Sequence, residues 1–276
     1  MNSEILNSEF AKRIEHAEIK AWMDMYEAAP KDYAENFQLG VQHLDSLVVF
    51  TAGGIPFGHF NCVLNLGLDE PATETQLEEV LKTLNAAQRQ HWYIHYNPHC
   101  EPANLREWFE RRNLKARSAW DRIYRNAEPL SPTLLTTDDV QVEKVTNATA
   151  REWAEFVSGV YHLPTVDWLA AFAERMGWHH YTLRKNSIIV AARSMFINRE
   201  GWAWLGIDAP VPGLMTNDFT LDWQICQRLV KDGLQLGAKH FVADIEAPTL
   251  DMDSPAYQHF ARLGFKKVYS RANYMP

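Results

Sequence analysis

The order of strand-like and helix-like segments after residue 139 is the feature that most limits the fold. Val140–Val145 reads as a strand, and residues 149–161 and 166–176 then follow as helices. A three-strand meander, a long helix, a strand, a helix and a final strand follow, in that order. These segments are His179–Lys185, Ile188–Asn198, Trp202–Ile207, Asp218–Leu234, His240–Glu246, Ser254–Leu263 and Phe265–Tyr274. Strands and helices that alternate in this way predict an α/β protein with a mixed sheet.

A linker separates this pattern from a similar one in the first half. Asn126–Asp139 contains two prolines and a Ser/Thr-rich run, without a hydrophobic period. Before it, we expect two helices within Ser3–Ala29 and a capping box at Thr73 and Gln76. Further strands are expected at 37–51, 61–66, 92–96 and 115–125, with helices at 73–84 and 103–112. The sequence therefore predicts two domains, residues 1–128 and 129–276, each with its own mostly antiparallel sheet.

Both halves end in a helix, a short turn and a strand. The segments are LREWFERRNLKARSAWDRIY and AYQHFARLGFKKVYSRANY. Their alignment matches Phe109 with Phe260, Asn113 with Gly264, and Leu114 with Phe265. Asn and Gly best tolerate the left-handed backbone that ends many helices. The alignment favours a diverged internal repeat, and convergence on a common helix–turn–strand pattern is the alternative.

The second half resembles the GNAT family of N-acetyltransferases. The residues that carry the resemblance are Gly201–Gly206, Pro212, Ser254–Tyr257, Arg262–Phe265 and Asn273–Tyr274. Among them, Gly264-Phe265 is similar to the family's GF motif. The resemblance implies a tandem duplication of the acyl-CoA N-acyltransferase fold, with a degenerate first copy. It also implies transfer of an acetyl group from acetyl-CoA to an amine, on a small molecule or a peptide.

The resemblance also implies where the cofactor binds. In the family, the pantetheine arm lies between two splayed strands, and the pyrophosphate lies at the N-terminus of the next helix. The corresponding residues here are Val211, Met215, Thr216, Asn217, Asp218, Phe219 and Thr220. The family's usual glycines are missing, and the Asp218 carboxylate would cap the helix but repel a pyrophosphate. The alternative function is an inactive scaffold that binds a small ligand or a protein.

Three residues are candidate acids and bases. Glu246 and Asp208 lie at strand ends, where the family often keeps a general base. Phe260 stands where many members have a tyrosine that acts as the general acid. Tyr257 lies about one helical turn earlier. The alternative is that both carboxylates are simply solvated and that Tyr257 is a packing residue. Strand alternation places Asp244 on the same face as Glu246.

Composition excludes several other classes. The net charge of −8 disfavours nucleic acid as a partner, and no apolar run is long enough to cross a membrane. Cys62, Cys100 and Cys226 lie far apart, which is typical of reduced thiols in the cytoplasm. His95, His99 and Cys100 lack a fourth partner for a zinc site, so we expect no metal. The oligomeric state stays open.

The carboxylate of Asp218 gives a direct test of cofactor binding. Two like charges about 4 Å apart repel by roughly 1–4 kcal/mol, and glycine retains most of the capping stability. Asp218→Gly should therefore tighten acetyl-CoA binding by roughly tenfold and lower the melting temperature slightly. The gain, measured by calorimetry, should shrink with added salt. An unchanged dissociation constant, with dephospho-CoA and pantetheine as controls, would show that the pyrophosphate does not bind here.

Overall fold

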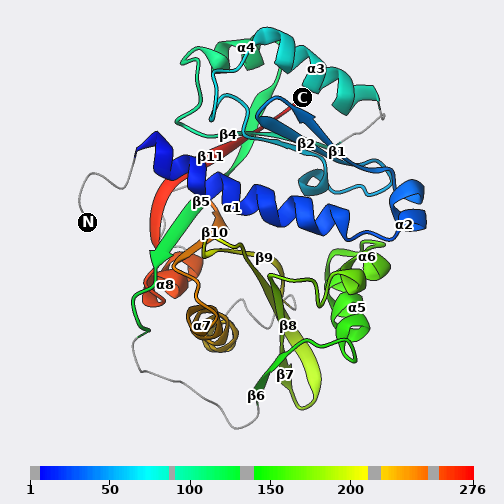
Figure 1. Ribbon diagram of the computed structural model, residues 1–276, viewed down its shortest axis with the longest axis vertical. Helices are drawn as coiled ribbons and strands as arrows, with labels where there is room; N and C mark the ends of the chain where they lie inside the picture. The colour runs from blue at the N-terminus through cyan, green and yellow to red at the C-terminus, as the bar shows by residue number, and fades with distance from the viewer. Residues whose placement is uncertain (1–6, 87–90, 131–139, 211–218, 248–254) are drawn as a thin grey trace. The chain divides into compact units, whose positions relative to one another are not determined.

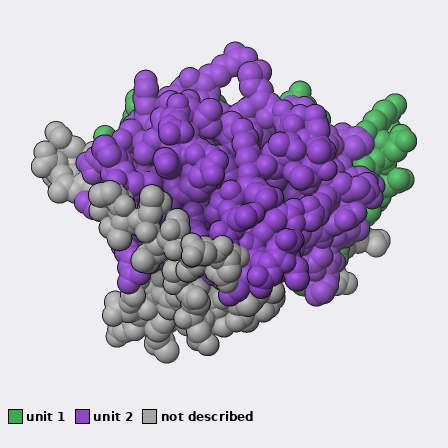
Figure 2. All heavy atoms as spheres, turned by 90° about the horizontal axis from the view of Figure 1, so that it is seen from below, with its two compact units in different colours: residues 1–27, 31–122, 268–276 green, residues 28–30, 123–267 purple. Residues whose placement is uncertain are grey.

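The chain forms two compact units. The computed structural model describes residues 7–86, 91–130, 140–210, 219–247 and 255–276 (Figure 1). Unit 1 comprises residues 1–27, 31–122 and 268–276, and unit 2 comprises 28–30 and 123–267; Figure 2 colours them separately. Two of the divisions, at 122/123 and 267/268, fall within strands, and none falls within 126–139. No helix in the described part of the chain is long and apolar enough to span a membrane.

Unit 1 consists of six neighbouring strands of the sheet and the helices that accompany them. The strands follow the order β1-β2-β3-β4-β11-β5. Its helices are α1 (Ser8–Glu27), α2 (Lys31–Asn36), α3 (Glu74–Ala86) and α4 (Leu105–Arg111), with a short turn of 3-10 helix at Gly58–Phe60. Its strands are β1 (Leu39–Leu44), β2 (Leu47–Ala52), β3 (Cys62–Leu64), β4 (Tyr93–Tyr96) and parts of β5 (Lys115–Asn126) and β11 (Lys266–Met275).

Two local predictions for unit 1 have opposite outcomes. The capping box is confirmed, because the Thr73 N–H donates to Gln76 Oε1 at 2.9 Å and the Gln76 N–H donates to Thr73 Oγ1 at 3.1 Å. The two helices expected within Ser3–Ala29 are wrong, since α1 is a single helix of 20 residues. It contains neither Gly nor Pro, and its buried positions recur every three or four residues.

A buried charge network connects α1 to two strands of unit 1. Arg271 Nη1 donates to Glu15 Oε2 at 2.7 Å and to Glu18 Oε2 at 2.5 Å, and Arg122 Nε donates to Glu15 Oε1 at 3.2 Å. Tyr269 OH adds a bond of 2.7 Å to Glu15. Burial alone would raise the pKa of Glu18, but the charges of Arg122 and Arg271 lower it to about 2. The negative charges of the two carboxylates therefore equal the positive charges of the two guanidiniums.

Unit 2 continues the strand order as β5-β10-β9-β8-β7-β6. Its strands are β6 (Val140–Lys144), β7 (Trp178–Lys185), β8 (Ile188–Ile197), β9 (Trp202–Pro210) and β10 (His240–Glu246), and its helices are α5 (Ala150–Tyr161), α6 (Val166–Ala171), α7 (Phe219–Gln235) and α8 (Pro255–Arg262). Because β5 is an unbroken strand that occurs in both orders, the sheet is continuous. The expectation of a separate sheet in each half is wrong.

Helix α7 packs on the sheet of unit 2 through an apolar face. Ile225 and Leu229, four residues apart, are buried in the same core as Phe241 of β10. Gly233 extends this face, and a Cβ atom there would lie only 2.6 Å from the Phe241 ring. The glycine lets the helix approach the sheet closely, which fixes the position of the α7 residues that face β8.

The same turn ends α4 in unit 1 and α8 in unit 2. Asn113 and Gly264 both have left-handed backbone, with φ of 58° and 85°. In each turn the next residue donates to a buried phenylalanine carbonyl at 3.0 Å; these bonds are Leu114 N–H to Phe109 and Phe265 N–H to Phe260. The aligned residues of the proposed repeat therefore hold equivalent positions.

Substitution of Gly264 tests this equivalence. A Cβ there would lie 3.7 Å from Arg125 Nε, so space is available and the cost is in the backbone. Gly264→Ala should lower the free energy of unfolding by about 1–2 kcal/mol, because alanine strains a left-handed position. Gly264→Asn should cost much less, since Asn113 already occupies the matching turn. Urea unfolding measures both variants, and equal losses would contradict the interpretation.

Candidate functional site

Strands β9 and β10 are parallel neighbours that separate part-way along their length. Their ladder runs from Trp202 opposite His240 to Leu205 opposite Ala243. It is not continued in the described residues 206–210 and 244–246. At this point β9 carries one extra residue relative to β8, and Ile207 has a left-handed φ of 57°. A β-bulge bends the strand that contains it, so the bulge accounts for the divergence.

Trp202 and Trp204 lie on β9 just before the point at which β9 and β10 diverge. Both are buried, as expected for residues on one face of β9. The Trp204 ring covers Gly206 so closely that a Cβ atom there would lie 2.0 Å from the ring. The Trp202 ring stacks on His240 of β10, with centroids 4.2 Å apart. The aromatic packing therefore ties the strands together below the bulge and requires glycine at position 206.

Arg193 extends from β8 to two carboxylates near the bulge. It forms a close ion pair with Asp208 of β9, and its Nε and Nη2 donate to Asp222 Oδ1 of α7 at 2.9 and 2.7 Å. The Asp222 side chain is 6% exposed, whereas that of Asp208 is 41% exposed. Burial alone would lower the pKa of Arg193, but the two carboxylates raise it well above its usual value. The guanidinium is therefore a permanent charge in this site.

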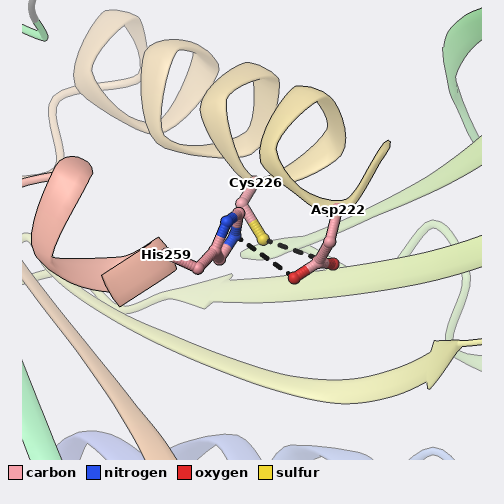
Figure 3. A group of neighbouring side chains, drawn as sticks. All are labelled: Asp222, Cys226 and His259. Carbon is pink, nitrogen blue, oxygen red and sulfur yellow. Dashed lines mark hydrogen bonds and ion pairs between the residues drawn. The ribbon is translucent and has the colours of Figure 1, made fainter. Parts of the chain in front are cut away.

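Asp222 also contacts two further polar side chains (Figure 3). Asp222 and Cys226 are one turn apart on α7, and His259 comes from α8. His259 Nε2 lies 3.2 Å from Asp222 Oδ2, and Cys226 Sγ lies 3.8 Å from Asp222 Oδ1. Burial lowers the pKa of His259 and raises that of Cys226 well above its usual value. At neutral pH the pair consists of a neutral imidazole and a protonated thiol.

A small cavity lies beside this cluster, with room for about one water molecule. Its lining includes charged and polar groups on both diverging strands and on α7. These residues include Arg193, Ser194, Asp208, Cys226 and Asp244. The cavity therefore joins the ends of the strands to the Asp222 cluster.

The structure separates the candidates that the sequence singles out. Asp208 lines the cavity, whereas Glu246 is exposed at the end of β10 and is not part of the lining. Asp244 and Glu246 flank the buried Ile245, as strand alternation predicts. Tyr257 lies in α8, but its side chain is outside the described residues, as are the side chains of Phe219 and Thr220 at the start of α7. Val211 and Met215, Thr216, Asn217 and Asp218 also lie outside the described residues.

Sequence reasoning missed the residues at the centre of the site. Arg193 is the one charged residue in a largely apolar strand, and a charge at such a position signals a buried partner. Asp222 and Cys226 have the spacing that places them on one helical face. By contrast, His95, which the sequence offered as a possible metal ligand, forms a hydrogen bond within unit 1. Its Nδ1 lies 2.6 Å from Asn273 Oδ1.

Solved structures share this architecture, although no family model and no curated protein matches the sequence. A GCN5-related N-acetyltransferase from Kribbella flavida is 13% identical, with a TM-score of 0.62 over 95% of this chain and 93% of that one. One from Sphaerobacter thermophilus is 9% identical, with a TM-score of 0.58 over 84% and 82%. A tandem GNAT protein from the clavulanic acid biosynthesis pathway, without acetyl-CoA, is 11% identical, with a TM-score of 0.55 over 83% and 77%. The chain therefore has the GNAT fold in tandem form.

The energetic role of Arg193 can be compared with that of Arg184. Each arginine pairs with two carboxylates, but the partners of Arg184, Glu143 and Glu152, are 45% and 52% exposed. Arg193→Met leaves Asp222 buried without its guanidinium and should cost about 3–5 kcal/mol of unfolding free energy. Arg184→Met should cost less than about 1 kcal/mol, because its partners become solvated. Urea unfolding followed by tryptophan fluorescence distinguishes the two; similar losses would count against a special role for Arg193.

Proposed function

We propose that unit 2 is a GNAT-type acyltransferase that moves an acetyl group from acetyl-CoA to an amine. The observation that carries the proposal is the divergence of β9 and β10 beyond Leu205 and Ala243, next to the bulge at Ile207. The pantetheine arm of coenzyme A contains amide groups, and an extended chain with amides can hydrogen-bond to strand edges. Diverging parallel strands fit such an arm.

The rest of the cofactor would lie near the start of α7. Helix N-termini favour anions through free N–H groups and the helix dipole. We propose that Val211 and the segment Met215–Thr220 contact the pyrophosphate, with Asp218 weakening that contact. The cavity at Asp208 holds only about one water molecule, so the thioester and the amine require the more exposed ends of the strands.

This argument favours Glu246 over Asp208 as the base. The carboxylate of Asp208 is already bound to Arg193, whereas Glu246 is exposed at the end of β10. Glu246 accepts a proton from the acceptor ammonium, directly or through water, and the freed nitrogen attacks the thioester carbon. The carbon–sulfur bond breaks, Tyr257 donates a proton to the departing thiolate, and the second proton of the attacking nitrogen returns to the tyrosine, directly or through water. The products are an amide and coenzyme A.

The acceptor is proposed to be an amine on a small molecule or a peptide. A carboxylate at the mouth of the site attracts a cationic amine. The buried thiols of Cys62, Cys100 and Cys226 fit a reducing compartment, so we propose a cytoplasmic location. We also propose that residues 1–128 and 129–276 descend from one duplicated domain, and that only the second carries the catalytic site.

The second candidate function is an inactive scaffold that binds a small ligand or a protein. Two observations favour it: Arg193 and Asp208 already fill part of the space near the bulge, and Asp218 opposes a pyrophosphate. On this reading, the divergence of β9 and β10 is inherited and holds no acyl donor. The two functions differ in whether acetyl-CoA binds.

Calorimetry with acetyl-CoA, followed by a thiol-release assay on a panel of amines, tests the enzyme. We expect acetyl-CoA to bind, and Glu246→Gln to lower kcat by roughly 10²–10⁴-fold while leaving acetyl-CoA affinity unchanged. Glu107→Gln, which alters an exposed glutamate on α4, is the matched control and should keep full activity. Absence of binding at millimolar acetyl-CoA would exclude the enzyme and favour the scaffold.

A further inference from the structure

Asp222, Cys226 and His259 bring an oxygen, a sulfur and a nitrogen to one point (Figure 3). Their ligand atoms all lie within 4.8 Å of one another, and all three residues are buried. A tetrahedral ion with bonds of about 2.0–2.3 Å holds its ligand atoms roughly 3.3–3.8 Å apart. The separation of 3.2 Å between His259 Nε2 and Asp222 Oδ2 is close to that geometry, and Cys226 Sγ lies 3.8 Å from the other carboxylate oxygen, Oδ1.

The ring nitrogen of His259 supplies an independent reason to expect a ligand. Nε2 is buried and makes no hydrogen bond to any described residue, although it points at the Asp222 carboxylate. A buried polar atom without a hydrogen bond is costly and calls for an explanation. A cation between the two residues would use both the nitrogen lone pair and the carboxylate charge.

The charges of the cluster point the same way. Asp208 and Asp222 carry two negative charges against the one positive charge of Arg193. Arg193 binds Oδ1 of Asp222, which leaves Oδ2 facing His259. A divalent cation that displaces the thiol proton of Cys226 into solvent brings the total charge of the cluster to zero. In that state Arg193 would orient the metal-binding carboxylate, as hydrogen-bonded neighbours of metal ligands commonly do.

We propose that Asp222, Cys226 and His259 form a zinc site that joins α7 to α8 within unit 2. Mixed nitrogen, oxygen and sulfur ligands in a tetrahedral arrangement suit Zn²⁺. The cavity that Cys226 lines has room for about one water molecule, which can complete the coordination. This site is separate from the proposed acyl transfer and does not depend on it. Its metal would stabilise unit 2, because binding to the folded site adds to the free energy of folding.

Cobalt gives a direct readout of sulfur ligation. The full chain, freed of metal with a chelator, is titrated with Co²⁺ and then with Zn²⁺. We expect one Co²⁺ per chain, a sulfur-to-cobalt charge-transfer band in the near ultraviolet and the intense visible bands of tetrahedral cobalt. Zn²⁺ should remove these bands, because it binds such sites more tightly than Co²⁺. It should also raise the unfolding midpoint.

Variants assign the bands to the three residues. Cys226→Ser should abolish the charge-transfer band, and His259→Gln should weaken Co²⁺ binding by at least about tenfold. Cys100→Ser removes another buried thiol, in unit 1, and should leave the band and the affinity unchanged. If circular dichroism shows that Cys226→Ser does not fold, His259→Gln decides the question. The proposal is overturned if saturating Co²⁺ gives no charge-transfer band, if Cys226→Ser keeps the band, or if His259→Gln binds Co²⁺ as tightly as the natural chain.

Discussion

The structure of unit 2 depends on the end of one short parallel ladder. Strands β9 and β10 pair over only four positions, and the bulge at Ile207 then turns β9 away. Trp204 can lie across the strand at this point only because residue 206 has no side chain. The divergence creates strand edges without a neighbouring strand, and such edges favour binding of another extended chain. The backbone conformation of one residue thus marks the point at which the two strands stop pairing.

Both units contain a buried ionic network, but the two differ in charge balance. In unit 1, Glu15 and Glu18 face Arg122 and Arg271, so equal numbers of charges meet. In the described part of unit 2, Arg193 faces two carboxylates, of which Asp222 is buried and Asp208 is 41% exposed. A balanced network satisfies itself and needs no further partner, whereas an excess of one charge in a buried place favours a counterion.

Local sequence patterns predicted those elements whose causes are local. The strand His240–Glu246, the capping box at Thr73 and the left-handed position of Gly264 follow from alternation, spacing and residue type. The cluster around Asp222 could not be found in this way. Arg193 and His259 lie about 30 and 40 residues from Asp222, and no periodic pattern encodes contacts at that separation. The continuous sheet was missed for a related reason, since the division between the units falls inside a strand rather than at the proline-containing linker.

The grouping of residues 268–276 with unit 1 has a consequence for biosynthesis. Glu15 and Glu18 meet Arg271 only after the whole of unit 2 has been translated. At ordinary elongation rates the roughly 150 residues between Arg122 and Arg271 take on the order of 10 s to make. During that interval α1 carries two acidic groups in an apolar face with only half of their counter-charge. The first unit therefore cannot complete its buried charge network until the last residues of the chain have been made.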